Sequence, residues 1–184
     1  PLESGRITIS RAGRQADFPA RFQLVAAMNP CPCGYLGEVT GDCRCSAERV
    51  QSYRAKVSGP LMDRIDIHMP VRRLPMEAMR ADPGDTETSA EVLARVCSAR
   101  DRQRMRAGSC NGRLEGDALE TTCRLTPPGW TLLERATDRF GLSARAHQRV
   151  RRVARTIADL AGCEHIEVEH VAEALSLRLP DKEL

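Results

Sequence analysis

Four cysteines within fifteen residues form the densest set of metal-binding side chains in the sequence. They stand as two Cys-x-Cys pairs, Cys31/Cys33 and Cys43/Cys45, with nine residues between the pairs. Two close pairs on a short loop can bring four thiolates to one tetrahedral zinc ion, although the usual spacing is Cys-x-x-Cys. The alternatives are two disulfides, which a cytosolic location would disfavour, or four reduced thiols without a metal. Zinc bound this way would be structural, because four protein thiolates leave no position open for water.

An amide and an arginine lie on either side of these cysteines. Asn29 follows the apolar run 22–28, which ends at an Asn-Pro breaker and is therefore predicted to be a buried strand. A polar side chain at the carboxyl end of a central strand is typical of ligand sites in open α/β sheets, but Asn-Pro is also a common turn. Arg64 has Asp63 and Asp66 close by in the sequence, so an internal ion pair is the simplest interpretation from the residues alone.

Two motifs around these positions resemble those of a known family. AAMNPCPCG at 26–34 is followed by SGPLMDRID at 58–66, and the combination resembles the ComM-like proteins, bacterial AAA+ ATPases related to the magnesium-chelatase ATPase subunit. The resemblance implies that Arg64 is an arginine finger for ATP bound to the neighbouring subunit. It also implies that Asn29 is the first sensor, which orients the attacking water or contacts the γ-phosphate. Arginine suits the finger because its planar guanidinium stays charged and grips phosphate oxygens in pairs.

Arg145, in the sequence Ser143-Ala144-Arg145, matches the second sensor of that family, which reaches the nucleotide from a helical lid. From the residues alone, it could equally be a solvated arginine in a first helical turn. The helix macrodipole disfavours a cation at such a position, so its presence indicates an anion nearby. Arg149 and Arg152 are expected to be solvated and receive no site role.

A hairpin is predicted near the amino terminus. Segment 3–11 alternates with a period of two, and Gly13 marks a turn before a return strand. The residues alone favour an edge hairpin whose charges discourage aggregation. The resemblance instead implies a hairpin that points into the pore of a ring, with Arg6, Arg11 and Arg14 as its basic residues. Arg11 and Arg14 are then expected to bind DNA.

Helix signals occupy the rest of the chain. Ser46 and Ser143 are good N-caps, and Gly141 and Gly162 are expected to end two helices. The longest helix places Ala146, Val150, Val153, Ile157 and Leu160 on one face. Helices are expected over 46–57, 89–106, 114–123, 126–140, 143–162 and 168–177.

The elements and the resemblance together predict the fold class. It is an α/β fragment of an AAA+ core, with hairpin, sensor strand and cysteine-rich insertion, followed by an all-α helical lid and mostly helical overall. The core part is expected over 1–75 and the lid over 89–184. Residues 76–88 are interpreted as an exposed linker, because this stretch is rich in Pro, Gly, Asp and Thr.

Composition fits a globular chain. Of the 184 residues, 41% are apolar and 29% are charged, and a net charge of +3 is too small to indicate nucleic-acid binding by itself. No apolar run could span a membrane, and the start lacks a signal-peptide pattern, so a cytoplasmic protein without a membrane partner is expected. The scattered cysteines are then reduced; they are Cys97, Cys110, Cys123 and Cys163.

Two ATPase motifs are absent from the sequence. It contains no G-x-x-x-x-G-K-[S/T] phosphate loop, the Walker A motif, and no apolar strand ending in paired acids, the Walker B motif. The chain also begins with Pro1-Leu2-Glu3 rather than Met, so it is expected to be part of a larger protein. Alone it is expected not to hydrolyse ATP.

The resemblance implies a function for that larger protein. It would be a cytoplasmic, hexameric ring ATPase that uses ATP and Mg²⁺ to drive DNA branch migration or unwinding in natural transformation, with structural Zn²⁺. One alternative is the ATPase subunit of a metal chelatase, which acts through partner proteins; the cysteine cluster favours the ComM-like interpretation. The other alternative is a zinc-stapled DNA-binding module without a motor. A Walker A motif upstream of Pro1 would exclude that module.

Overall fold

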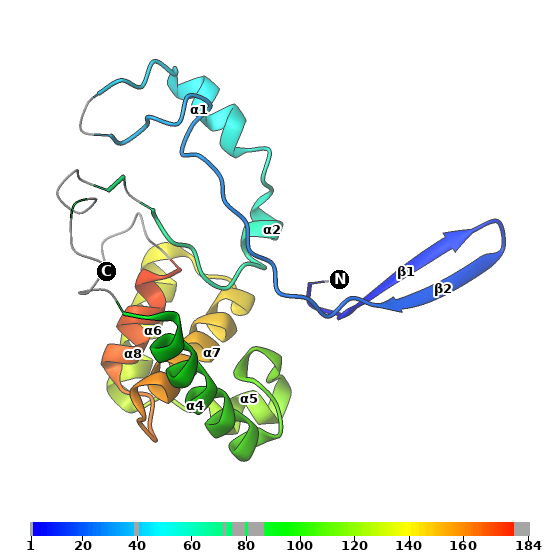
Figure 1. The fold of residues 1–184 in the computed structure, drawn as a ribbon, viewed down its shortest axis with the longest axis vertical. Coiled ribbons are helices and arrows are strands. Elements are labelled where there is room, and N and C mark those ends of the chain that lie inside the picture. The colour runs from blue at the N-terminus through cyan, green and yellow to red at the C-terminus, as the bar shows by residue number, and fades with distance from the viewer. Residues whose placement is uncertain (1, 39–40, 72, 75–79, 81–86, 179–184) are drawn as a thin grey trace. The chain divides into compact units, whose positions relative to one another are not determined.

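The computed structural model describes residues 2–38, 41–71, 73–74, 80 and 87–178. They divide into two compact units, Pro1–Ile65 (unit 1) and Asp66–Leu184 (unit 2). Helices outweigh the single two-stranded sheet (Figure 1), so the predicted fold class of an α/β fragment followed by a helical lid is confirmed. Most of the expected linker 76–88 lies outside the described residues.

Unit 1 begins with an antiparallel hairpin, as predicted. β1 (Arg6–Arg11) pairs with β2 (Arg14–Pro19), the blue ribbon of Figure 1. Ala12 and Gly13 form the turn with φ of 40° and 78°. Positive φ at both central residues matches the right-handed twist of the flanking strands. Every residue of the two strands is exposed, so the hairpin contributes little to a core.

The prediction of a buried strand over 22–28 is wrong. These residues form no strand, and Phe22 and Val25 are 57% and 86% exposed. An apolar run becomes a buried strand only where neighbouring strands pair with its N–H and C=O groups. In the described part of the chain the sheet contains only β1 and β2, which pair with each other. The composition therefore identifies an apolar run but does not show whether neighbouring strands pair with it.

Two short helices complete unit 1. α1 (Ala47–Arg54) begins after Ser46, whose hydroxyl accepts a hydrogen bond from the Arg49 N–H at 3.3 Å. This confirms the predicted cap, although the helix ends earlier than expected. α2 (Gly59–Met62), which was not anticipated, begins after Ser58 and carries a proline in its first turn, where the missing N–H needs no partner.

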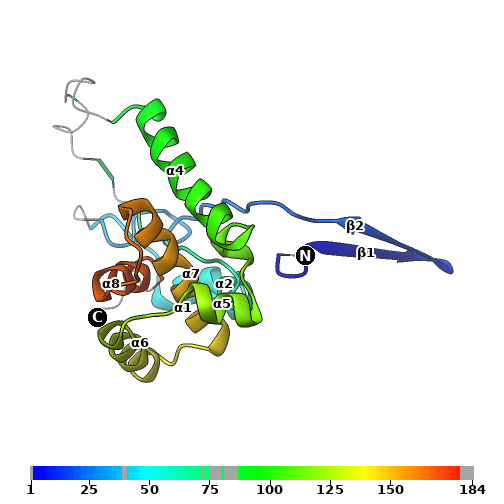
Figure 2. The same ribbon diagram turned by 90° about the horizontal axis from the view of Figure 1, so that it is seen from below.

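In the described residues of unit 2 the regular elements are helices, as predicted, and one isolated parallel bridge joins Leu125 to Ile166. Its elements are α4 (Ser89–Ala107), the short 3-10 helix η2 (Asn111–Arg113), α5 (Gly116–Thr122), α6 (Pro127–Phe140), α7 (Ala144–Ala161) and α8 (Val168–Ser176). Gly141 and Gly162 end α6 and α7 with φ of 64° and 78°, as expected. α4 starts with a capping box between Thr88 and Glu91, and Figure 2 shows its first half projecting past the other helices of unit 2.

α7 contributes to the apolar core of unit 2. Its Val150 is buried in one cluster with Leu133 of α6 and Leu175 of α8. Leu160, predicted on the same buried face, is instead 41% exposed. In the last turn of α7 the neighbouring Asp159 is the side chain that is buried, because it has polar partners there.

Asp159 is the charged centre of this unit. It is 1% exposed, and the Arg106 guanidinium donates to both of its carboxylate oxygens at 2.7 Å. The Asn111 amide donates to the same carboxylate at 2.8 Å, and Arg155 lies 3.1 Å away. Burial raises the pKa of Asp159, but these hydrogen bonds and positive charges outweigh it, so the pKa lies below its usual value. The carboxylate thus links α4, η2 and α7.

The prediction that Arg149 and Arg152 are solvated is wrong for Arg149, whereas Arg152 is half-buried. Arg149 is 8% exposed and donates to the Asp66 carboxylate. The Arg152 Nε donates to the Leu114 carbonyl at 2.9 Å. A buried guanidinium is tolerated only with such partners, and here they come from distant parts of the sequence.

Candidate functional site

The four clustered cysteines converge on one point of unit 1. Their sulfur atoms all lie within 4.8 Å of one another, and all four are free thiols rather than two disulfides. The Cys31 and Cys33 sulfurs are 3.3 Å apart, and the Cys43 sulfur lies 3.7 Å and 3.6 Å from them. Sulfurs bound tetrahedrally at about 2.3 Å from a zinc ion stand about 3.8 Å apart. The cluster therefore has the donor atoms and nearly the spacing that such a metal ion requires.

A tight turn presents the first pair of cysteines. The Gly34 N–H donates to the Cys31 carbonyl at 3.0 Å, and Gly34 and Gly37 have φ of 85° and 87°. Glycine adopts this region without the steric cost that a Cβ imposes. The Arg54 Nε donates to the Pro30 carbonyl at 3.2 Å, so α1 is hydrogen-bonded to the start of the cysteine loop.

The thiols of the four clustered cysteines differ in pKa. Burial raises the pKa of Cys31, but hydrogen bonds from the Cys33 thiol and from backbone N–H groups lower it to about 6. The Tyr35 N–H lowers the pKa of Cys33. The Cys45 N–H lowers the pKa of Cys43, but burial and the neighbouring sulfurs raise it to about 11. Because adjacent thiolates repel, all four sulfurs can be deprotonated together only when a cation compensates their charge.

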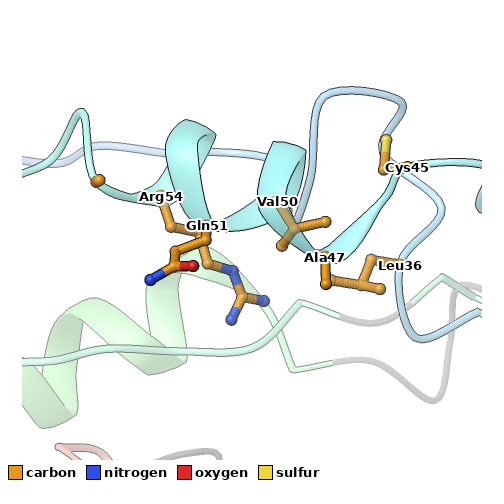
Figure 3. A pocket seen from close by; sticks show the side chains of 7 residues that line it. Leu36, Cys45, Ala47, Val50, Gln51 and Arg54 are labelled. Atoms are coloured by element: carbon orange, nitrogen blue, oxygen red, sulfur yellow. The ribbon is translucent and has the colours of Figure 1, made fainter.

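A shallow hollow of about 680 Å³ lies between α1 and the cysteine loop (Figure 3). It is lined by Leu36, Cys45, Ala47, Val50, Gln51, Arg54 and Ala55. Most of these side chains are small or aliphatic, and Cys45 connects the hollow to the sulfur cluster. The lining includes neither Asn29 nor Arg64, so the hollow belongs to the packing around the cysteines rather than to the predicted nucleotide contacts.

Arg64 follows α2 directly and is partly exposed. Its Nε lies 3.3 Å from a Glu3 carboxylate oxygen, and its Nη1 donates to the Pro60 carbonyl at 3.0 Å. The side chain is 34% exposed, so a larger anion could displace the carboxylate. An internal ion pair therefore exists, but Glu3 takes part in it, while Asp66 binds Arg149.

The two predicted sensors are both exposed side chains. Asn29 follows segment 22–28, and its amide lies beside Gly34. Arg145 is in the first turn of α7, directly after the Ser143 cap, whose hydroxyl accepts from the Ala146 N–H at 3.2 Å. Asn29 and Arg64 belong to unit 1 and Arg145 to unit 2, and their roles toward nucleotide stay predictions.

Arg11 and Arg14 lie opposite each other at the end of the hairpin, and both are exposed. Two polar contacts between distant parts of unit 2 were not predicted from the sequence. One is the ion pair between Arg149 and Asp66, which are separated by 83 residues. The other is Arg151, which binds Glu120. No local sequence signal marks such pairs, because each depends on elements meeting in the fold.

Comparison with known proteins covers both units. The family described as "Magnesium chelatase, subunit ChlI" matches residues 1–79, and "Magnesium chelatase, subunit ChlI C-terminal" matches residues 86–178. Competence protein ComM of Haemophilus influenzae is 43% identical over 178 residues, which are 97% of this chain and 35% of that protein. This chain belongs to the ComM-like, magnesium-chelatase-related family.

Further relatives align over the same length of this ComM-like chain. Uncharacterized protein YifB of Salmonella typhimurium is 40% identical over 183 residues, 99% of this chain and 36% of the relative. An uncharacterized protein of Mycobacterium bovis is 40% identical over 182 residues, 97% of this chain and 35% of the relative. The chain thus spans 35–36% of the length of these curated relatives. None of its described helices is long and apolar enough to cross a membrane.

Proposed function

We propose that this chain is the carboxyl-terminal part of a hexameric, cytoplasmic ComM-like AAA+ ATPase that drives DNA branch migration or unwinding in natural transformation. The observation that carries the proposal is the 43% identity to competence protein ComM over 97% of the chain. That alignment is long enough to include the cysteine cluster of unit 1 and the helices of unit 2. The phosphate loop, which these 184 residues lack, would come from the remainder of the longer protein.

Three side chains serve ATP and Mg²⁺ in this proposal. Arg64 is the arginine finger for the neighbouring subunit, and its partial exposure and its surface ion pair with Glu3 support that role. Such a finger stabilises charge in the transition state and contributes about 10³ to 10⁵ in rate. Asn29 is the first sensor and Arg145 the second. Arg145 stands at a helix N-terminus, where the dipole adds to its attraction for a phosphate.

Zinc and DNA occupy the other two sites. Zn²⁺ bound by Cys31, Cys33, Cys43 and Cys45 would cross-link the cysteine loop to the start of α1, as a structural ion with no open coordination position. Its thiolates require the reducing conditions of the cytoplasm. Arg11 and Arg14 at the end of the hairpin bind DNA phosphates.

The test uses the longer protein that contains this chain. Its ATP hydrolysis should rise when a four-way DNA junction is added, and a labelled junction should be converted to duplex products only with hydrolysable ATP. A rate of ATP hydrolysis that does not change with any added DNA, together with no conversion of the junction, would contradict the proposal. DNA binding without any hydrolysis would instead identify a non-motor zinc-stapled module.

A second candidate is the ATPase subunit of a metal chelatase. The description of both matching families as magnesium chelatase subunit ChlI favours it. Under this alternative ATP hydrolysis responds to a porphyrin-metallating partner complex and not to DNA. Measuring hydrolysis with each effector in turn separates the two candidates.

A further inference from the structure

The hairpin has two chemically different faces. Residues directly opposite in an antiparallel pair share a face, and so do alternate residues along each strand. The register therefore divides the strands into two sets. The first face carries Ile7, Ile9, Arg11, Arg14, Ala16 and Phe18. The second face carries Arg6, Thr8, Ser10, Gln15, Asp17 and Pro19.

The second face has polar contacts within the hairpin. The Thr8 hydroxyl donates to the Asp17 carboxylate at 2.5 Å across the strands. The first face instead exposes apolar side chains: Ile7 is 43% exposed, and Ile9 and Phe18 are each 49% exposed. Contact with a ligand or partner would remove this apolar area from water, which is favourable.

Two arginines continue the apolar face to the end of the hairpin. Arg11 is directly opposite Arg14, and like charges at such a position destabilise the pair. An anion held between them would relieve that repulsion. A second copy of the same face would add two more cations, so charge argues against self-association through this surface.

One face thus combines paired guanidinium groups with an adjoining apolar strip that contains an aromatic ring. Single-stranded nucleic acid has the complementary chemistry, since its phosphates are charged and its unpaired bases stack on aromatic side chains. Duplex DNA offers the same phosphates but keeps its bases stacked inside the helix. The apolar strip therefore favours the single strand.

We propose that this face of the hairpin binds single-stranded DNA, with Arg11 and Arg14 on phosphates and Phe18, opposite Ile7, against unpaired bases. This inference rests on the proposed function and narrows its substrate from DNA in general to a displaced single strand.

The test measures fluorescence anisotropy of the 184-residue chain with labelled oligo-dT and with a blunt duplex of equal length, over a salt series. Oligo-dT should bind more tightly. Phe18→Ala should weaken its binding about five- to tenfold with an unchanged salt slope, because stacking on one base carries no counterion release. Arg11→Ala should reduce the slope by about 0.7, the value for one phosphate of a single strand. Gln15→Ala, on the opposite face, is the matched control and should change neither quantity.

Ring chemistry separates base stacking from hairpin folding. Phe18→Tyr should keep the affinity for oligo-dT, whereas Phe18→Leu, equally apolar, should lose most of what Phe18→Ala loses. Wild-type affinity in Phe18→Ala, or equal affinity for the duplex, overturns this inference and leaves the DNA role of Arg11 and Arg14 standing. Binding to neither probe contradicts both proposals. A change in sedimentation by Phe18→Ala without a change in DNA affinity would identify a second chain as the occupant and also overturn it.

Discussion

The interior of unit 1 and the interior of unit 2 are stabilised by different kinds of contact. Cys31 is the only buried residue among those described in unit 1. Unit 2 buries an apolar cluster on four helices and, beside it, the carboxylate of Asp159 with its arginine partners. A region with so few buried side chains needs a cross-link to hold one conformation, and the proposed metal bound by four thiolates would provide it.

The difference also concerns where each unit offers chemistry. Unit 1 leaves Arg64, Asn29 and the hairpin arginines near the surface, so they remain available to other molecules. Unit 2 places Arg145 on α7, a helix fixed by buried contacts on its other side. Substitutions in unit 1 should therefore change rate or binding, whereas substitutions in the interior of unit 2 should change stability.

The largest expected effect is on catalysis. In the longer ATPase, Arg64→Ala should lower the rate of ATP hydrolysis by about 10³ or more while nucleotide affinity stays nearly constant, since a finger acts mainly in the transition state. Arg64→Lys should not restore the rate, because an ammonium lacks the two-pronged contact. Steady-state hydrolysis and titration with a fluorescent ATP analogue provide the two readouts.

Glu3→Gln is the matched control for Arg64, because it removes the carboxylate charge that pairs with the Arg64 guanidinium and leaves Arg64 itself in place. It should leave hydrolysis within about twofold of the wild type, in keeping with the small energy of such pairs. An equal loss of rate in both variants, accompanied by a lower melting temperature, would identify Arg64 as a structural residue.

Metal removal should have the next largest effect, confined to unit 1. Purified chain should carry about one zinc ion. A chelator, or Cys43→Ser, should increase hydrogen exchange in the peptides of the cysteine loop and α1 and leave α7 protected, because the metal contributes directly to folding. Cys97→Ser alters an exposed cysteine outside the cluster and should change nothing. This prediction is contradicted if the purified chain contains no metal under reducing conditions and the four thiols of the cluster react freely with a thiol reagent.

A substitution at Asp159 should affect unit 2 and should lower its stability. Asp159→Ala leaves Arg106 and Arg155 without their carboxylate and should destabilise unit 2 by about 3–5 kcal/mol. The fluorescence of Trp130, the single tryptophan of the chain, reports the unfolding of unit 2 in urea titrations. Asp138→Ala, at an exposed site on α6, should cost little.

The pH dependence follows from the lowered pKa of Asp159. A carboxyl group whose pKa is lower in the folded state stabilises the fold fully above the unfolded value of about 3.9 and loses this contribution as the pH falls through the folded pKa. Wild-type unit 2 should thus lose stability in acid more steeply than Asp159→Ala. Parallel acid profiles for the two proteins would contradict the role of this carboxylate.

Local signals explain what could be predicted from the sequence. The hairpin turn, the caps at Ser46 and Ser143 and the glycine ends of α6 and α7 depend on adjacent residues, and all are confirmed. The convergence of the four cysteines also follows from short spacing and is confirmed as geometry.

Long-range partners explain the failures. The run 22–28 has the composition of a strand but no strand pairs with it in the described residues. Arg149 is buried because Asp66, far away in the sequence, meets it in the fold. Leu160 is exposed because Asp159 takes the buried position beside it. Hydrophobic periodicity predicts that arginine and aspartate lie at the surface. It cannot predict an ion pair that allows these residues to be buried.

The smallest expected effects come from the two serine caps. Ser143→Ala should destabilise unit 2 by about 1 kcal/mol, since the Ala146 N–H loses its acceptor. Ser46→Ala removes the same kind of bond in unit 1, but a metal ion bound by the proposed cluster, which includes the adjacent Cys45, should hold the first turn of α1 in place. Hydrogen exchange of α1 should therefore respond to Ser46→Ala only after chelation. An equal response with the metal present would show that the cluster does not support the helix.

The central claim, that Arg64 completes an active site in the neighbouring subunit, is tested most directly by mixing two inactive proteins. One carries Arg64→Ala; the other keeps Arg64 but lacks the lysine of its phosphate loop. In mixed rings some interfaces join an intact finger to an intact phosphate loop, so ATP hydrolysis should reappear. Absence of hydrolysis in mixed rings whose assembly is verified by native mass spectrometry would contradict the claim.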